Sequence, residues 1–255
     1  MEVYWLEQAE LDLPSEDDWL SPGEMARLDT LRFAKRRNDW LLGRWTAKSA
    51  VALFLKVPGD PQVLASIEIR PAPSGAPEVF FQNKPAATAI SLSHRAGIAA
   101  CAVTCSSGVL GCDLEIIEPR SDAFLADYFT TAEQSFVAGA SVEDRSRLVA
   151  LLWSAKESAL KALRSGLRLD TRSVMVGPFD ALGSHRGDAT WCTGDRVGMV
   201  RSSNGFDGWR PLQVCYGKSQ VFDGWWQNTH GLIRTIVALP PPELPILLAR
   251  APCFS

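Results

Sequence analysis

Two acidic side chains lie two residues apart in GCDLE, residues 111–115, and a third lies in WSAKESALK, residues 153–161. The strand-like alternation of the first segment puts Asp113 and Glu115 on one face. Two carboxylates on one strand face repel each other unless a cation lies between them, and hard oxygen ligands in this number suit Mg²⁺. Asp-x-Glu by itself is more typical of a solvated strand edge, so a third carboxylate would decide the assignment.

The third carboxylate is Glu157, in a segment with helical periodicity. Ser154, Glu157 and Lys161 share one face of that helix, and the apolar stripe lies elsewhere: Leu152, Ala155, Ala159 and Leu163. Glu157 can therefore point at Asp113 and Glu115 with Lys161 one turn beyond. A metal ion and a lysine are the usual means of stabilising charge on a phosphoryl group in transfer. A structural salt bridge or a surface i,i+4 pair is the competing interpretation of Glu157 and Lys161.

A cationic segment, RFAKRRNDWLLGRWTAK at residues 32–48, holds six basic side chains and one acidic one. Arg37, Arg44 and Lys48 recur at helical positions i, i+7 and i+11, which predicts a cationic stripe. A solvated face or a nucleic-acid contact would also fit this composition. The formal net charge of -3, however, provides no global field toward nucleic acid or an anionic membrane. A small polyphosphate ligand is the more economical target, because guanidinium groups match phosphate geometry.

A further phosphate contact is possible in ISLSHRAG, residues 90–97, where a predicted strand ends in a turn. Ser93 and His94 could each donate a hydrogen bond to a phosphate oxygen. A Ser-His pair at the end of a strand is more often a turn cap, so this pattern carries weight only beside the other motifs.

Two helical tracts position these residues, about 22–55 with a break and about 131–163. Both begin with a capping pattern, a hydroxyl residue followed three positions later by glutamate: Ser21 with Glu24, and Thr130 with Glu133. Each tract contains a similar stretch, WTAKSAV or WSAKESA, and each is followed by short strand-like runs. These runs are SIEIRP, PEVFF, TAISLS and GIAACAVT after the first tract, and SVMVG, ATWC, RVGMV and LQVCYG after the second.

The repeated pattern predicts an α+β fold of two similar lobes related by a pseudo-twofold axis, with the active site between them. The expected boundaries are 1–107 for the first lobe, 108–215 for the second and 216–255 for a C-terminal extension. Aligning the two stretches places Lys48 on Lys156, whereas Glu157 and Lys161 have no charged counterpart in the first copy. A single active site between unequal copies would produce this asymmetry.

Composition limits the cellular context. The six cysteines form no CxxC pair, so we expect reduced, partly buried thiols rather than disulfides or zinc ligands. The acidic N-terminus has neither the basic nor the apolar region of a signal peptide, and no apolar run approaches the length of a membrane span. These features predict a cytoplasmic protein with no membrane partner.

Together these motifs resemble the 4′-phosphopantetheinyl transferase superfamily, specifically its larger two-lobed, Sfp-type class. The resemblance is carried by GCDLE and WSAKESALK, about forty residues apart. Four further stretches reinforce it: SGAP at 74–77, SLSH at 91–94, YFTTAE at 128–133 and KRRNDWLLGRWTAK at 35–48. It spans about residues 20–170.

The resemblance implies that coenzyme A binds between the lobes with Mg²⁺, or Mn²⁺, on its diphosphate. A serine hydroxyl of an apo acyl or peptidyl carrier protein would attack the β-phosphate and release 3′,5′-ADP. By position, Asp113, Glu115 and Glu157 would be metal ligands, Glu157 or a water on the metal would be the base, and Lys161 would contact the phosphates. The remaining coenzyme A contacts would be Arg37, Arg44, Lys48, Gly75, Pro77, Ser93, His94 and Lys156. The pseudo-dimeric chain is expected to act as a monomer.

Two other functions compete with the transferase. A non-catalytic adaptor on the same fold would bind a carrier protein or coenzyme A without turnover, although a pure binder has little need of Asp113, Glu115 and Glu157. A nucleic-acid binder using residues 32–48 is disfavoured by the negative net charge. The chain departs from the family pattern at Ala76, where a basic residue is common.

Overall fold

Helix α1 (Pro22–Asp29) begins at the capping box that the sequence predicts. Ser21 Oγ accepts a hydrogen bond from the Glu24 amide at 3.2 Å, and Glu24 Oε2 accepts one from the Ser21 amide at 3.1 Å. Pro22 suits the first helical position because it has no amide hydrogen to satisfy there. After a short break the chain continues as α2 (Ala34–Leu55), so the expected interruption of the first tract is confirmed.

The same capping arrangement starts α5 (Thr131–Ala138), where Thr130 and Glu133 form the box. A break separates α5 from α6 (Val142–Ala162), whose N-cap is Ser141. The shorter helical elements are α3 (Pro61–Ser66), α4 (Asp122–Tyr128), and 3-10 turns at Glu10–Asp12, Gly166–Arg168 and Thr171–Ser173.

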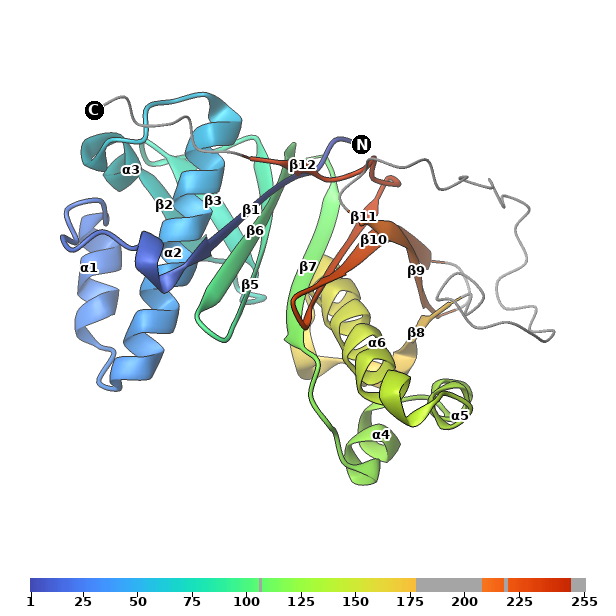
Figure 1. Ribbon diagram of the computed structural model, residues 1–255. Coiled ribbons are helices and arrows are strands. Elements are labelled where there is room, and N and C mark those ends of the chain that lie inside the picture. Colours follow the sequence, from blue (N-terminus) through green and yellow to red (C-terminus); the bar gives the residue numbers. More distant parts are fainter. Residues whose placement is uncertain (106, 178–207, 218–219, 249–255) are drawn as a thin grey trace.

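The computed structural model describes residues 1–105, 107–177, 208–217 and 220–248. Figure 1 shows two groups of elements side by side, α1–α3 with β1–β6 and α4–α6 with β7–β11. The described residues of 1–105 and 246–247 are called the first lobe below, and those of 109–239 the second lobe. The chain is a mixed α+β protein, as predicted.

The first lobe contains a four-stranded sheet with α2 packed against it. Its strand order is β12 (Ile246–Leu247), β1 (Tyr4–Ala9), β6 (Ile98–Cys105) and β5 (Thr88–Arg95). β12 pairs parallel with β1, so the chain returns to the first lobe after completing the second. A smaller sheet in this lobe has the order β2 (Ile67–Pro71), β3 (Pro77–Phe81) and β4 (Lys84–Pro85).

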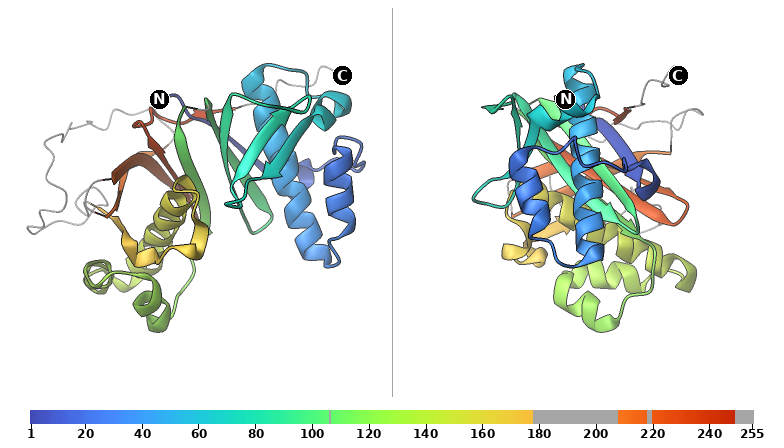
Figure 2. Two further views of the ribbon diagram at one scale, coloured as in Figure 1. Left: turned by 180° about the vertical axis from the view of Figure 1, so that it is seen from behind. Right: turned by 90° about the vertical axis from the view of Figure 1, so that its left-hand side faces the viewer.

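The second lobe contains a five-stranded sheet with α6 lying across one face (Figures 1 and 2). Its strand order is β7 (Val109–Ile116), β11 (Leu232–Leu239), β10 (Gln220–Thr229), β9 (Arg210–Tyr216) and β8 (Val174–Val176). Strands β10 and β11 lie between β7 and β9 in this sheet. The sequence had predicted that residues 216–255 form a separate C-terminal extension. The two strands belong to the sheet because their apolar side chains pack beneath α6: Phe222, Trp226, Ile233 and Val237.

Two of the strands predicted from the sequence, ATWC at 189–192 and RVGMV at 196–200, lie outside the described residues. Strand β1 was not predicted, yet Trp5 and Leu6 within it are buried in the core. Among the described cysteines none forms a disulfide; Cys101, Cys112 and Cys215 are buried and Cys105 is exposed. Over the described ranges, no helix combines the length and apolar character needed to cross a bilayer.

The lobes meet through a shared apolar core. Val3, Trp5, Ala100 and Ala102 of the first lobe pack against a set from the second: Leu110, Cys112, Leu114 and Ile236. Arg234 of β11 forms a two-pronged ion pair with Glu7 of β1, and one of its hydrogen bonds, from Nη2 to Oε2, is 2.8 Å long. The lobes are therefore held together by burial and by a charged contact, and residues at their junction keep fixed positions.

Candidate active site

A glycine and three hydroxyls fix helix α6 on its sheet. A Cβ added at Gly111 of β7 would lie 1.8 Å from the carbonyl oxygen of Ser158, so only glycine lets the helix approach this closely. The hydroxyl of Thr235 lies 2.8 Å from that of Ser154 and 2.7 Å from that of Ser158. These contacts set the register of α6, and the register places Glu157 and Lys161 beside the polar face of β7.

Asp113 is the centre of the polar face of β7. Its Oδ1 accepts hydrogen bonds from Lys161 Nζ at 2.7 Å and from Ser93 Oγ at 2.8 Å. Lys161 Nζ also donates to the Cys112 carbonyl at 3.0 Å. Asp113 Oδ2 is buried and has no hydrogen-bond partner. The carboxylate thus joins both lobes and keeps one oxygen available.

Two serines of β5, in the first lobe, form hydrogen bonds to the backbone of β7, in the second lobe, on either side of Asp113. Ser91 Oγ accepts a hydrogen bond from the Cys112 amide at 2.9 Å, and Ser93 Oγ accepts one from the Leu114 amide at 3.2 Å. These bonds connect β5 to β7 although the two strands belong to different sheets. In this structure Ser93 is therefore engaged with the acidic cluster.

Glu115 lies between two guanidinium groups. Its Oε2 is 3.5 Å from Arg95 Nε and 3.6 Å from Arg120 Nη2, and it is buried without a hydrogen-bond partner. Both arginines also pair with Glu118, at 2.7 and 2.9 Å. The two arginines therefore hold Glu115 at the cluster, and neither was expected there from the sequence.

The negative charge of Asp113 affects the protonation of its two acidic neighbours. Burial, followed by the negative charge of Asp113, raises the pKa of Glu157 to about 7, although Lys161 acts in the opposite direction. Burial and Asp113 likewise raise the pKa of Glu115, against the lowering effect of Arg95 and Arg120. Burial by itself would lower the pKa of Lys161, but Asp113 and further neighbours raise it above its ordinary value. Crowded acids of this kind are common where a cation or a proton is handled.

The chemistry of these donors fits a divalent cation. Asp113 Oδ2 and Glu115 Oε2 are buried oxygens without a hydrogen-bond partner, which a hard cation could satisfy. Within the part of the chain that the structure describes, however, no three His, Cys, Asp or Glu side chains are arranged to hold a metal ion. The ligand set of Asp113, Glu115 and Glu157 therefore stays a prediction.

A cleft of about 570 Å³ lies next to Lys161 at the junction of the lobes. The lining comes from the end of β2 and the turn into β3 (residues 71 and 74–77), from β5 (residues 89–92) and from residues 107–110. Four residues expected to bind coenzyme A are among the lining: Arg44, Gly75, Pro77 and Lys161. Gly75 has φ +88°, a backbone conformation that favours glycine in the turn.

Two further basic residues line the cleft, Arg70 and Arg164. Arg70 pairs with Glu68, and its guanidinium lies over the ring of Phe80 at 4.1 Å. Both line the cleft together with Ala76, which stands where the family pattern commonly has a basic residue. The sequence offered no signal for Arg70 or Arg164, because each reaches the cleft from an element outside the recognised motifs.

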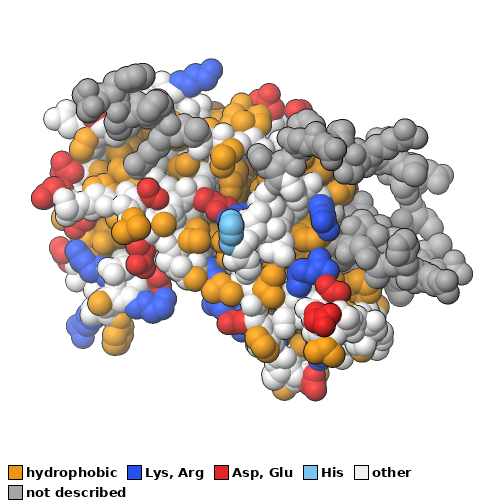
Figure 3. All heavy atoms as spheres, viewed as in Figure 1, with side chains coloured by type: hydrophobic (Ala, Val, Ile, Leu, Met, Phe, Trp, Pro, Cys, Tyr) orange, Lys and Arg blue, Asp and Glu red, His pale blue; other side chains and the backbone are white. Residues whose placement is uncertain are grey.

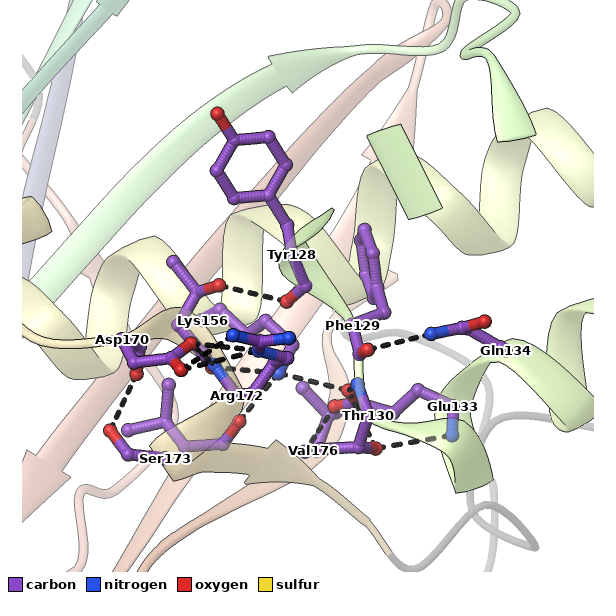
Figure 4. A network of polar contacts seen from close by, with 12 residues as sticks. Tyr128, Phe129, Thr130, Glu133, Gln134, Lys156, Asp170, Arg172, Ser173 and Val176 are labelled. Carbon is purple, nitrogen blue, oxygen red and sulfur yellow. Dashed lines mark hydrogen bonds and ion pairs between the residues drawn. The ribbon is translucent and has the colours of Figure 1, made fainter. Parts of the chain in front are cut away.

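Lys48 and Lys156 occupy the protein interior, which does not support the coenzyme A contacts expected of them. Lys156 Nζ lies 2.9 Å from Glu133 Oε2 and donates to the carbonyl oxygens of Thr171 and Val174 (Figure 4). Lys48 pairs with Glu24 and donates to the Trp19 carbonyl in the same way. Both lysine side chains are 0% exposed. Each ammonium therefore neutralises the glutamate of a capping box and has no access to a ligand.

Arg37 and His94 also lie outside the cleft lining. Arg37 donates to Asp17 at 3.4 Å and to the Leu28 carbonyl at 3.3 Å, which directs it toward α1. His94 lines a separate groove with Asp39, whose carboxylate is 3.9 Å from its Nε2. Burial lowers the pKa of His94, although Asp39 acts to raise it.

Comparison with known proteins agrees with the character of this site. Residues 109–202 match the family model of the 4′-phosphopantetheinyl transferase superfamily. No curated protein matches the chain by sequence. Among solved structures, the chain is similar to Helicobacter pylori holo-[acyl-carrier-protein] synthase in complex with coenzyme A, with 18% identity over 41% of this chain and 99% of that one. The TM-score of that match is 0.33.

Proposed function

We propose that this chain, a member of the 4′-phosphopantetheinyl transferase superfamily by its match over residues 109–202, transfers 4′-phosphopantetheine from coenzyme A to a serine of an apo acyl or peptidyl carrier protein. The observation that carries the proposal is the position of the acidic cluster. Asp113 and Lys161 form an ion pair at the edge of a cleft between the lobes that is also lined by arginines.

The cleft suits a polyanionic substrate. Its volume of about 570 Å³ lies within the usual range for small-molecule sites. Arg44, Arg70 and Arg164 would neutralise the phosphate charges, and the turn at Gly75 would lie beside the nucleotide. The local positive charge compensates for the negative net charge of the chain, which by itself would repel coenzyme A.

Asp113, Glu115 and Glu157 would hold a magnesium ion on the diphosphate. When bound, the ion would reduce the charge repulsion that a nucleophile meets at the phosphorus atom. The two buried carboxylate oxygens without partners support this assignment. The ammonium of Lys161 would turn from Asp113 toward the phosphate oxygens and offset the charge that develops on the leaving group.

The transfer exchanges one phosphorus–oxygen bond for another. The serine oxygen of the carrier forms a bond to the β-phosphorus, and the bond from that phosphorus to the bridging oxygen breaks. The bonding electron pair leaves with 3′,5′-ADP, and the serine proton passes to a base. Glu157 is the proposed acceptor: burial and Asp113 raise its pKa to about 7 in the metal-free protein, and a cation held beside it would lower that pKa, so the carboxylate would be ionised near neutral pH. Catalysis then depends on position and charge, and needs no nucleophile from the protein.

The test is the modification of purified apo carrier proteins by a fluorescent coenzyme A, with release of 3′,5′-ADP measured in parallel. Asp113→Ala and Glu157→Ala should each abolish labelling while the fold, followed by circular dichroism, is retained. Glu143→Ala on the first turn of α6 is the matched control and should label as the parent protein does. Carrier binding without any release of 3′,5′-ADP would identify a non-catalytic adaptor and contradict the proposal.

A further inference from the structure

A second groove, of about 510 Å³, lies where the start of α2 meets the end of β5. Its lining contains apolar, basic and acidic side chains: Phe33, Lys35, Arg36, Asp39, Trp40 and His94. None of the residues that line it also lines the coenzyme A cleft. The groove is therefore separate from the cleft.

Strand β5 connects the groove to the cleft through the acidic cluster. Residues 89–92 line the cleft, the next residue, Ser93, donates to Asp113, and His94 lines the groove. The electrostatic environment of His94 reflects this position, because Asp39 and Lys35 act on it together with Lys161 and Asp113. Along β5 the cleft therefore ends one residue before the serine that holds Asp113, and the groove begins one residue after it.

The surface around the groove is basic with an apolar centre. Phe33 is 75% exposed, and Arg32, Lys35 and Arg36 beside it are exposed as well. At the lower left tip of the molecule in Figure 3, where α1 ends and α2 begins, Lys and Arg side chains surround exposed hydrophobic atoms. Asp39 is the acidic member of the lining, and Lys35 neutralises it at 2.7 Å. The exposed charge that remains is positive.

Arg32, Lys35 and Arg36 do not line the cleft proposed for coenzyme A. Of the six basic residues between positions 32 and 48, Arg44 lines the cleft, Lys48 is buried and Arg37 is held by Asp17. Arg32, Lys35 and Arg36 remain exposed beside the groove. A small phosphate ligand would have no use for an exposed phenylalanine, whereas a protein surface would bury it.

We infer that this groove is the docking surface for the acceptor protein, and that it receives an acidic surface with an apolar side chain that covers Phe33. The inference rests on the proposed function. In phosphoryl transfer the attacking and leaving oxygens lie roughly in line, so the acceptor must approach the phosphorus from the side opposite the departing nucleotide. Along β5 the groove lies beyond Ser93, the residue that donates to Asp113, and the cleft lies before it; the charge of the groove complements an acidic partner.

The experiment measures the Michaelis constants for an apo carrier protein and for coenzyme A separately. Lys35→Glu combined with Arg36→Glu should raise the constant for the carrier by about tenfold at low ionic strength, and the difference should shrink as salt screens it. Phe33→Ser should raise the same constant without that salt dependence. The constant for coenzyme A should stay within about twofold of the parent value in all of these variants, because the groove and the cleft share no lining residue.

Lys84→Glu, an exposed charge reversal on β4, is the matched control and should leave both constants unchanged. If the parent protein transfers the group and the groove variants keep the parent constant for the carrier, the docking surface is overturned while the transferase function stands. If the variants raise the constant for coenzyme A equally, the groove serves the cofactor and the inference fails. If the parent protein transfers nothing to any carrier, the proposed function fails and the docking surface fails with it.

Discussion

Lys161 Nζ lies 2.7 Å from Asp113 Oδ1, an ion pair that connects the last turn of α6 to β7 beside the cleft. Asp113 is 5% exposed and would be a poorly solvated charge without this partner. A bound cation could take over the same role, so the pair connects the stability of the protein with its proposed chemistry.

Lys161→Met should lower the free energy of unfolding by about 2 kcal/mol in the absence of divalent cations, because it leaves a buried carboxylate without its ammonium. Magnesium should then stabilise the variant more than it stabilises the parent protein. Urea unfolding with and without magnesium measures both effects. Lys35→Met is the control, since its pair with Asp39 is on the surface and 87% of the lysine side chain is exposed. An equal response to magnesium in the parent and Lys161→Met proteins would contradict this reasoning.

Glu157→Gln should change how stability depends on pH. The pKa of Glu157 in the folded protein is raised to about 7, above its ordinary value, mainly by burial. The protonated carboxyl therefore contributes stability that is fully present below the ordinary pKa of about 4.5 and is lost as the pH rises through about 7. With a chelator present, the variant should become more stable than the parent protein by about 2 kcal/mol near pH 8, allowing for solvent screening, and equal to it near pH 4. A difference that does not vary with pH would show that Glu157 titrates normally.

Gly111→Ala should destabilise the protein by about 3 kcal/mol, because the new Cβ would lie 1.8 Å from a backbone oxygen of α6. The helix would have to move away from β7, which would also separate Lys161 from Asp113 and reduce transfer activity by at least about tenfold. Gly43→Ala is the matched control. Nothing lies within 4 Å of its added Cβ, so this helical substitution should stabilise α2 by about 0.5 kcal/mol. Parent-like stability of Gly111→Ala would refute the close packing of helix and strand.

Lys156→Met tests whether the buried lysine is structural. We expect a loss of about 3 kcal/mol in unfolding free energy, because Glu133 would remain buried without its partner. The Michaelis constant for coenzyme A, measured on the folded fraction at low temperature, should be unchanged. The opposite pattern, normal stability with weakened coenzyme A binding, would restore the ligand contact expected from the sequence.

Local patterns accounted for the parts of the fold that depend on neighbours in the chain. The capping boxes at Ser21 and Thr130 and the two sides of β7 follow from residues a few positions apart, and they were predicted correctly. The burial of Lys48 and Lys156 could not be predicted in this way. Their partners, Glu24 and Glu133, already had a local role as capping residues, and nothing in the sequence shows that the capping oxygen, Oε2, also faces a lysine.

Contacts between residues far apart in the sequence also limited how much of the site could be predicted. Asp113 and Lys161 were expected together because strand and helix periodicities place them on polar faces, and the structure brings them into contact. Arg70, Arg95 and Arg120 reach the site through strand pairing and loop geometry that no local period encodes. Strands β10 and β11 were not assigned to the second lobe because β11 joins it by pairing with β7, which lies more than a hundred positions earlier in the chain, and β10 pairs with β11.

The most direct measurement is the anomalous scattering of manganese in crystals of the protein grown with coenzyme A and Mn²⁺. The account predicts a single strong peak among the carboxylate oxygens of Asp113, Glu115 and Glu157, in contact with the coenzyme A diphosphate in the cleft beside Lys161. A manganese peak away from these carboxylates, or coenzyme A bound with its diphosphate elsewhere, would contradict it.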